Sequence, residues 1–198
     1  METVKGVVLA QRALREQDRF IDVLTAEHGV IEILVKGASK ITSKTGSATQ
    51  LFAYSQFSLA DRKHGRVRTL NSVTPIEIFY GLRRSVTAVA LASYFSQVVS
   101  YSVLPRAGTP EILRLLLNTL HYLSEQSREE ALLKVVFELR LASLLGFMPD
   151  VVMCRKCGAY LPSQLAFSVE EGCFCCRDCQ SADTLTTPPV NMPASCLQ

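Results

Sequence analysis

Residues 3–80 carry short runs typical of β-strands: residues 3–10 are rich in Val, and apolar and polar side chains alternate weakly over 19–25 and again over 52–59. Turn signals containing Gly29 and Gly65 separate neighbouring runs. Gly6, inside the first run, indicates a bend or a bulge. Five short strands with Gly-bearing turns are typical of a small barrel, either an OB-fold or an SH3-like barrel. We predict these strands over residues 3–10, 19–25, 30–35, 52–59 and 66–73.

After residue 81 the apolar positions recur every three or four residues, the period of an α-helix. We predict three helices, the second starting with Thr109 as N-cap and Pro110 as its first residue. The third starts at a capping box formed by Ser127 and Glu130. We interpret the apolar stripes as core: Leu82, Val86, Val89, Ala90, Tyr94 and Val98 in the first helix, Ile112, Leu115, Leu116 and Leu120 in the second, and Leu132, Val136, Leu139 and Leu144 in the third.

A Cys-rich segment follows the helices, and residues 164–176 within it are predicted to form a hairpin. From Ser181 the chain is rich in Thr and Pro, and nothing there can build a core, so we expect a disordered tail. The pattern therefore divides the chain into a barrel over 1–80, a helical domain over 81–150, a Cys-rich module over 151–180 and a tail over 181–198.

Two Cys-x-x-Cys pairs lie near the end of the chain, Cys154 with Cys157 and Cys176 with Cys179. Residues 158–175 separate them, a spacing typical of a four-thiolate structural zinc site. Each turn directs two thiolates toward one point, and two turns complete a tetrahedron with zinc–sulfur distances of about 2.3 Å. Such a closed site stabilises a fold and leaves no coordination position for catalysis.

A second choice of metal ligands, in another register, is also possible, because Cys173 and Cys176 form a Cys-x-x-Cys pair as well. That register would place Phe174 in an exposed turn, whereas charged residues fill both turns of the first register, which we favour. Disulfides or unliganded thiols would also account for these cysteines, and disulfides are disfavoured because cytosolic thiols stay reduced. The cysteines left over, predicted to be free thiols, are Cys173, Cys175 and Cys196.

Composition and charge narrow the class of protein. Hydrophobic residues make up 48% of the chain and charged residues 20%, as in a globular protein. There is no membrane-spanning apolar run and no signal-peptide pattern at the N-terminus, so we interpret the protein as cytoplasmic. The net charge is +3, and residues 1–80 hold all of the excess, with 11 Lys and Arg against 8 Asp and Glu. A polyanion partner would bind there, although ordinary surface variation gives the same distribution.

A loop is predicted over residues 36–47, which are rich in small residues and contain no acid. Its lysines can contact successive phosphates of a nucleic acid: Lys36, Lys40 and Lys44. The turn after the fourth strand extends this surface through Arg62, Lys63, Arg66 and Arg68. Candidates for stacking on unpaired bases are Phe52, Tyr54 and Phe57. A solvated loop and core aromatics are the competing interpretation of the same residues.

Enzymatic activity is disfavoured. The chain has no Gly-x-x-x-x-Gly-Lys-Ser/Thr phosphate loop and no His-x-Glu motif ahead of Pro-Cys-x-x-Cys, the signature of zinc deaminases. A zinc enzyme also needs an open coordination position, which a four-thiolate site does not provide. We therefore predict that the protein is not an enzyme.

Several short motifs occur in a distinctive order. They begin with Lys5-Gly6-Val7-Val8-Leu9 and continue through Glu16-Gln17-Asp18-Arg19, Leu24–Gly29 and Lys36-Gly37-Ala38. Later motifs are Phe137–Leu141, Leu145–Pro149 running into the first Cys pair, and Phe167-Ser168 leading through Gly172 to the second. This order, over roughly residues 1–180, resembles that of the RecO family of bacterial recombination mediators. Family members usually continue with more helix after the second pair, where this chain has its Thr- and Pro-rich segment.

The resemblance implies an α+β protein with an N-terminal five-stranded OB-fold barrel, a helical domain and a zinc module. One structural Zn²⁺ would be held by Cys154, Cys157, Cys176 and Cys179. It also implies binding and annealing of single- and double-stranded DNA, with the 36–44 lysines facing DNA. Its partners would be RecR and the C-terminal tail of the single-stranded DNA-binding protein, in helping to load RecA at gaps. The alternative is a protein-interaction adaptor with a structural zinc site and no DNA binding of its own.

Overall fold

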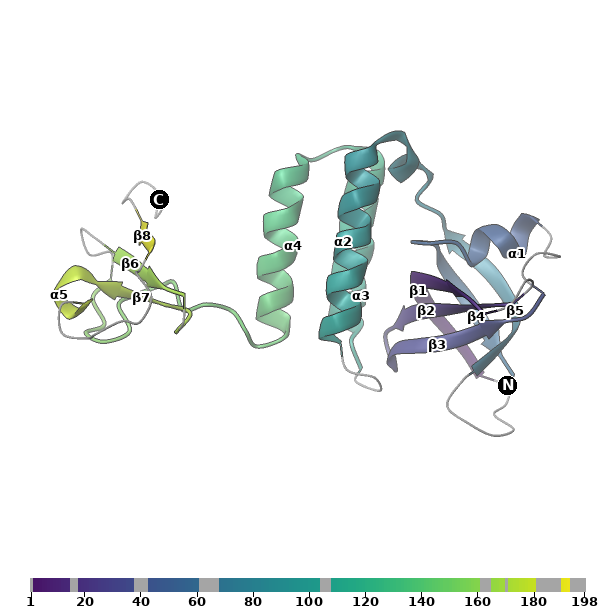
Figure 1. Ribbon diagram of the computed structural model, residues 1–198, viewed down its shortest axis with the longest axis horizontal. Coiled ribbons are helices and arrows are strands. Elements are labelled where there is room, and N and C mark those ends of the chain that lie inside the picture. The colour runs from purple at the N-terminus through teal and green to yellow at the C-terminus, as the bar shows by residue number, and fades with distance from the viewer. Residues whose placement is uncertain are drawn as a thin grey trace. The chain divides into compact units, whose positions relative to one another are not determined.

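A computed structural model of the chain describes residues 2–14, 18–37, 43–60, 68–103, 108–160, 165–169, 171–180 and 190–192. Contacts between residues divide the chain into two compact units, residues 1–144 and 145–198. The first unit contains a β-barrel and three α-helices that follow it, and the second contains the Cys-rich segment (Figure 1). Within the described ranges, none of the helices combines the length and the apolar composition needed to cross a bilayer.

Five strands form the barrel: β1 (Glu2–Ala13), β2 (Arg19–Thr25), β3 (Gly29–Val35), β4 (Tyr54–Leu59) and β5 (Arg68–Glu77). They close in the order β1-β2-β3-β5-β4, with β3 and β5 parallel and the other pairs antiparallel. This is the five-stranded barrel of an OB-fold, as predicted. A short helix, α1 (Ser43–Ala48), lies between β3 and β4, inside the stretch where a loop was expected.

Alternation along the strands fills the barrel interior with aliphatic and aromatic side chains. The buried cluster consists of Val4, Val8, Ile21, Val23, Ile31, Ile33, Val35, Phe57 and Leu59. β1 is also buried on its other face, through Val7 and Leu9, where the helices pack against it. The irregularity in β1 falls between Val8 and Ala10, whereas Gly6 pairs regularly with Thr25.

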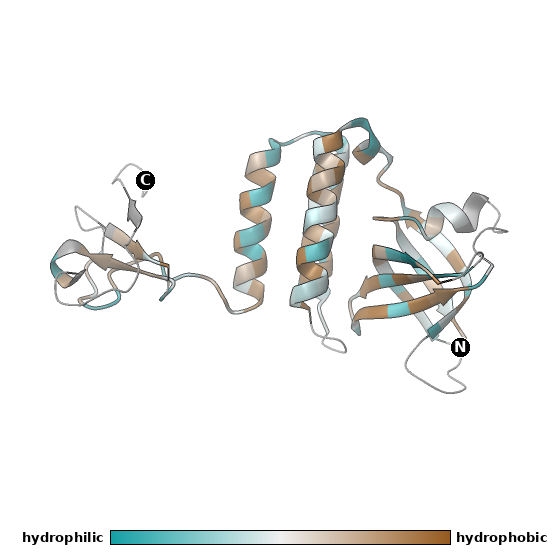
Figure 2. Ribbon diagram, viewed as in Figure 1, coloured by the Kyte–Doolittle hydropathy of each residue, from teal (hydrophilic) through white to brown (hydrophobic). Residues whose placement is uncertain are grey.

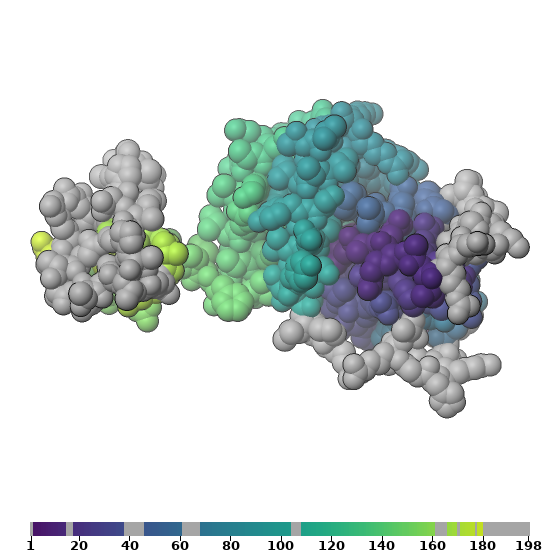
Figure 3. Space-filling model, in the orientation of Figure 1, coloured from purple at the N-terminus to yellow at the C-terminus, as the bar shows by residue number. Residues whose placement is uncertain are grey.

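The helical part of the first unit comprises the 3₁₀-helix η2 (Tyr80–Arg84), α2 (Val86–Ser102), α3 (Pro110–Glu125) and α4 (Glu130–Leu144). α2 and α3 contact the barrel strands, and Figure 3 shows helices and barrel meeting in one continuous surface. Ser85 caps α2 by accepting a hydrogen bond from the N–H of Ala88 at 3.2 Å. Thr109 precedes α3 as predicted, but its hydroxyl donates to the carbonyl of Thr25 at 3.2 Å and so ties the helix to the end of β2.

The predicted capping box does not start α4. The N–H of Ser127 instead donates to the carbonyl of Tyr122 at 3.3 Å and closes the end of α3. Because that amide belongs to the α3 terminus, α4 begins only at Glu130. The Glu130 carboxylate accepts from the Ser85 hydroxyl at 3.5 Å, which links the start of α4 to the start of α2.

The predicted buried stripe is right for α3 and wrong for α2 and α4. α3 buries Ile112, Leu116 and Leu120 as expected. Leu82, the first residue of the predicted stripe, is buried in η2, but α2 itself buries Ala88, Ala92, Phe95 and Val99, while Val86 is 89% exposed. α4 buries Leu133, Phe137 and Leu141, and Leu132, Val136, Leu139 and Leu144 are exposed. Figure 2 shows apolar and polar residues alternating along the visible face of α4. When apolar residues surround a helix, its period alone does not select the buried face.

The second unit contains a small antiparallel sheet in the order β7-β6-β8. β6 (Leu165–Ser168) and β7 (Cys173–Cys176) are the predicted hairpin, and α5 (Arg177–Gln180) follows directly. β8 (Val190–Met192) pairs with the free edge of β6. Part of the segment expected to be a disordered tail is therefore a strand, and its other residues lie outside the described ranges.

Candidate metal centre and nucleic-acid interface

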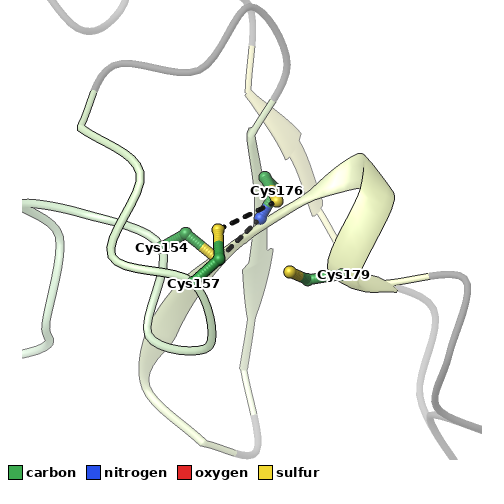
Figure 4. Close-up of side chains that lie close together, drawn as sticks. All are labelled: Cys154, Cys157, Cys176 and Cys179. Carbon is green, nitrogen blue, oxygen red and sulfur yellow. Dashed lines mark hydrogen bonds between the residues drawn. The ribbon is translucent and has the colours of Figure 1, made fainter.

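Three short pieces of the second unit bring four cysteines together (Figure 4). Cys154 and Cys157 lie on a tight turn, closed by the N–H of Gly158, which donates to the Cys154 carbonyl at 2.8 Å. Gly158 has a φ of 70°, the left-handed conformation that suits glycine at such a turn. Cys176 ends β7, and Cys179 lies in α5. All four sulfurs lie within 4.8 Å of one another.

The distance between two of the sulfurs fits a tetrahedrally coordinated metal ion. The Sγ atoms of Cys157 and Cys176 are 3.6 Å apart. Zinc–sulfur bonds of about 2.3 Å at tetrahedral angles separate two sulfurs by about 3.8 Å. The Cys176 N–H also donates to the Cys154 Sγ at 3.3 Å, and such N–H···S bonds favour a thiolate. The four residues therefore suit a structural Zn²⁺, with no ligand position left for a substrate.

The pKa values of two of these thiols are strongly shifted, in opposite directions. Burial by itself raises the pKa of Cys154, but hydrogen bonds from the backbone of Cys157, Cys176 and Lys156 outweigh it and lower the pKa to about 6. Hydrogen bonding with Cys176 and Cys157 raises the pKa of Cys179 to about 12. Four thiols this close cannot all lose their protons without a compensating cation, and a divalent metal supplies that charge.

The cysteines of the alternative register do not gather at this point. Cys173 lies on β7 three positions before Cys176 and so faces the other side of the strand. Its sulfur is close to Glu171 and Cys175 instead. Cys196 lies outside the described residues.

The predicted DNA-contacting residues lie mainly at the edge of the barrel or outside the described residues. Lys36 is exposed directly after β3, and the N–H of the next residue, Gly37, donates to the Asp18 carboxylate before β2 at 2.9 Å. Arg68 is only 8% exposed, and its guanidinium lies 3.3 Å from the Glu2 carboxylate. Lys44 lies in α1, and the remaining predicted residues lie outside the described part of the chain: Lys40, Arg62, Lys63 and Arg66.

The aromatic residues considered for base stacking are mostly inside the fold. Phe57 is fully buried in the barrel and Phe52 is 9% exposed, so neither can stack on a base in this fold. Tyr54 is half-buried.

Phe20 was not among the candidates for base stacking that were identified from the sequence. Phe20 lies on the outer face of β2, because its neighbour Ile21 points into the core. It pairs across the sheet with Leu34. The alternation within β2 would have identified Phe20 once Ile21 and Val23 were assigned to the interior.

Two carboxylates lie on the same outer face, next to Phe20. Asp22 and Glu32 are directly opposite each other on β2 and β3. Arg12 donates to both, at 2.9 Å and 2.7 Å. The Asp22 carboxylate and Glu32 also raise the pKa of Arg12. The guanidinium offsets one of the two negative charges of this pair.

A groove runs between α3 and α4 in the first unit, with a volume of about 490 Å³. Its apolar lining includes Leu115, Leu132, Val136 and Leu144. Arg114, Arg128 and Arg140 also line it, together with Glu111, so the lining has an excess of positive charge. The Arg128 guanidinium lies 6.0 Å from the centre of the Tyr122 ring, a cation–π contact that positions it at the groove. An apolar groove with an excess of positive charge suits an acidic peptide with apolar side chains.

Comparison with known proteins assigns nearly the whole chain to one family. The family model for the N-terminal part of recombination protein O matches residues 1–79, and the model for its C-terminal part matches residues 83–191. The DNA repair protein RecO of Acetivibrio thermocellus is 33% identical over 178 residues, which are 90% of this chain and 70% of that protein. RecO of Alkaliphilus metalliredigens is 30% identical over 182 residues, 92% of this chain and 73% of that protein. RecO of Bacillus pumilus is 29% identical over 184 residues, 93% and 70% of the two chains.

Proposed function

Because this chain belongs to the RecO family of DNA repair proteins, we propose that it is a non-enzymatic recombination mediator acting on DNA in the bacterial cytoplasm. It binds single- and double-stranded DNA, anneals complementary strands and, with RecR, helps load RecA at gaps. The four-thiolate cluster holds one structural Zn²⁺ and takes no part in chemistry.

The OB-fold barrel is the observation that carries DNA binding. OB-folds bind oligonucleotides on the outer face of strands 2 and 3 and through the connections 1–2 and 4–5. Lys36 lies beside the β1–β2 connection, since its neighbour Gly37 is hydrogen-bonded to Asp18. The β4–β5 connection carries three cations by sequence, Arg62, Lys63 and Arg66. Lys36 at the end of β3, the cations that the sequence gives the β4–β5 connection and the aromatic Phe20 on β2 together support a site for phosphates and an unpaired base.

Arg68 has a different part in this proposal. Its side chain is mostly buried against Glu2, at the start of β5. The Glu2 carboxylate therefore offsets its charge, and in this proposal Arg68 anchors the start of β5 next to the β4–β5 connection without reaching a phosphate itself.

The test is a fluorescence-anisotropy titration of labelled oligonucleotides at two salt concentrations. One variant replaces Arg62, Lys63 and Arg66 with Ala, and another replaces Lys36, Lys40 and Lys44. Each should weaken binding and reduce the slope of log affinity against log salt by about 0.7–0.9 for every phosphate that is no longer neutralised. Phe20→Ala should weaken binding to single strands more than to duplex, because only unpaired bases can stack.

The matched control removes the same charge from the α3–α4 groove, by replacing Arg114, Arg128 and Arg140 with Ala. It should leave the DNA affinity and the salt slope of the wild type nearly unchanged. Absent or salt-independent DNA binding by the wild type would favour an adaptor and overturn the mediator proposal. Equal loss in all three triple variants would show a response to net charge only and would overturn the assignment of the DNA-contacting residues.

We assign the second expected partner, the C-terminal tail of the single-stranded DNA-binding protein, to the α3–α4 groove. An acidic tail with apolar residues near its terminal carboxylate matches the charge of the three arginines and the apolar lining. A labelled peptide of that composition should bind the wild type and lose at least about tenfold in affinity to the Arg114, Arg128 and Arg140 variant. The Arg62, Lys63 and Arg66 variant is its control. Equal peptide binding by both variants would place the tail elsewhere.

A further inference from the structure

A second group of metal-ligating side chains lies in the second unit, separate from the four-cysteine cluster. It consists of Glu171, Cys173 and Cys175, whose ligand atoms all lie within 4.8 Å of one another. Cys173 and Cys175 are two positions apart on β7, so their side chains project from the same face of the strand. Both are buried, with exposures of 0% and 7%. A pair of thiols on one face of a strand already provides two soft ligands directed to one side.

The second group faces away from the first. Cys176 and Phe174 occupy the alternate positions of β7 and project from its opposite face. The Cys176 amide and sulfur contact Cys154 and Cys157, and the Phe174 ring packs edge-on against Phe167. One strand therefore separates two sets of ligands, and an ion bound to one set does not use a ligand of the other.

The turn before β7 positions the third ligand. Two hydrogen bonds close it, from the N–H of Gly172 to the Ser168 carbonyl at 2.9 Å and from the N–H of Glu171 to the Ser168 hydroxyl at 3.3 Å. They hold Glu171 so that its carboxylate oxygen lies 3.5 Å from the Cys173 Sγ. Zinc–sulfur and zinc–oxygen bonds of about 2.3 and 2.1 Å at a tetrahedral angle place these two atoms about 3.6 Å apart.

We propose that Glu171, Cys173 and Cys175 form a second, three-ligand site for a thiophilic divalent cation such as Zn²⁺. Two thiolates and one carboxylate coordinate the ion, and a water molecule takes the fourth tetrahedral position. Binding releases the protons of both thiols to solvent, so the net charge at the site stays at −1: the carboxylate alone carries it before binding, and the dication with two thiolates and the carboxylate carries it afterwards. Glu171 is exposed, which gives the ion a path from solvent.

The test uses the full chain, reduced and loaded with one equivalent of Zn²⁺, and titrates it with Co²⁺ as a spectroscopic probe. One further equivalent should bind and produce the charge-transfer and ligand-field absorption of a tetrahedral ion with two thiolates, while the zinc stays bound. Glu171→Gln, which keeps every thiol, should weaken the Co²⁺ affinity about tenfold or more. Cys175→Ser should remove most of the thiolate-to-cobalt absorption. Glu129→Gln in the first unit removes the same charge and should change nothing.

Each contrary result overturns the proposal. Failure of the wild type to bind a second equivalent excludes the site. Equal Co²⁺ binding by the wild type and Glu171→Gln would mean an adventitious ion only. A loss of zinc from Glu171→Gln would mean that Glu171 supports the first site and not a second one. DNA affinity is not a readout here, so the outcome does not depend on the proposed mediator function.

Discussion

Two glycines of the first unit lie where no larger residue fits. A Cβ on Gly6 would overlap the Leu24 carbonyl oxygen, because β1 and β2 approach closely there. A Cβ on Gly81 would overlap the carbonyl oxygen of Ser124, at the end of α3. The Gly81 N–H also donates to the Ser124 hydroxyl at 3.1 Å, so the backbone of η2 packs directly against the end of α3. Gly6 was predicted to mark a bend or bulge, and its structural role is close approach instead.

Gly81→Ala should lower the free energy of unfolding by about 3 kcal/mol, since the methyl group forces η2 away from α3. Urea denaturation followed by circular dichroism measures this change. Gly46→Ala is the matched control, because nothing lies within 4 Å of a Cβ at that position of α1. It should be neutral or stabilise by up to about 1 kcal/mol through helix propensity. A loss as small for Gly81→Ala as for the control would disprove the close packing of η2 on α3.

At the scale of elements, α2 and α4 are joined by one apolar and one polar contact. The rings of Phe95 and Phe137 lie 4.2 Å apart at their centres. On the surface beside them, the Tyr94 hydroxyl donates to the Glu138 carboxylate at 2.5 Å, and Lys134 donates to the same carboxylate at 2.6 Å. Hydrogen bonds from Lys134 and then Tyr94 lower the pKa of Glu138. The polar contact therefore stabilises the pairing of these helices while Glu138 is ionised.

Glu138→Gln should destabilise the protein at pH 7 by about 1 kcal/mol, a value discounted for the exposure of the carboxylate. The folded pKa of Glu138 lies below its unfolded value of about 4.3. The stabilisation is therefore complete above that unfolded value and is lost as pH falls through the folded pKa. Urea denaturation at pH 7 and near pH 3 should show the difference between wild type and variant shrinking.

Glu125→Gln, on α3, removes a carboxylate of the same type and serves as the control for that experiment. It should show a smaller effect at pH 7. A difference between wild type and Glu138→Gln that stays constant with pH would contradict the role of the ionised carboxylate.

At the scale of the whole molecule, the two units differ in what stabilises them. The first has a closed barrel and three helices around aliphatic cores. The second has strands of four, four and three residues beside the four-cysteine cluster. A sheet this small buries little apolar surface, and small modules of this kind usually need metal or disulfides to fold.

Removing the proposed structural Zn²⁺ should therefore unfold the second unit and leave the first intact. Hydrogen exchange of the chelator-treated protein should show protection lost for amides of 165–176 and kept for those of β1 and β2. Re-addition of Zn²⁺ should restore protection. Equal loss of protection in both units would mean that they do not fold separately.

Much of the fold was predictable because short-range patterns encode it. Val-rich and alternating runs between Gly-bearing turns located all five barrel strands to within a few residues, and Cys-x-x-Cys spacing identified four cysteines that the fold brings together. Cap residues were less reliable. The Thr109 hydroxyl donates to the Thr25 carbonyl of β2, a partner far away in the sequence, and the Ser127 amide donates to the Tyr122 carbonyl and so closes α3 in place of starting α4.

The sequence by itself determined the five barrel strands, the three long helices, the hairpin of β6 and β7 and the favoured set of four cysteines, because turns, periodicity and pair spacing depend on residues close together in the chain. Helix α1 and strand β8 were not among them, since a loop and a disordered tail were expected there. Only the tertiary structure decided which stripe of α2 and α4 is buried, since both helices are apolar on more than one side and the choice depends on their neighbours. It also buried Phe57, placed Phe20 on the outer face and paired Arg68 with Glu2. Those outcomes rest on contacts between strands far apart in the sequence, where pairing register sets the direction of every side chain.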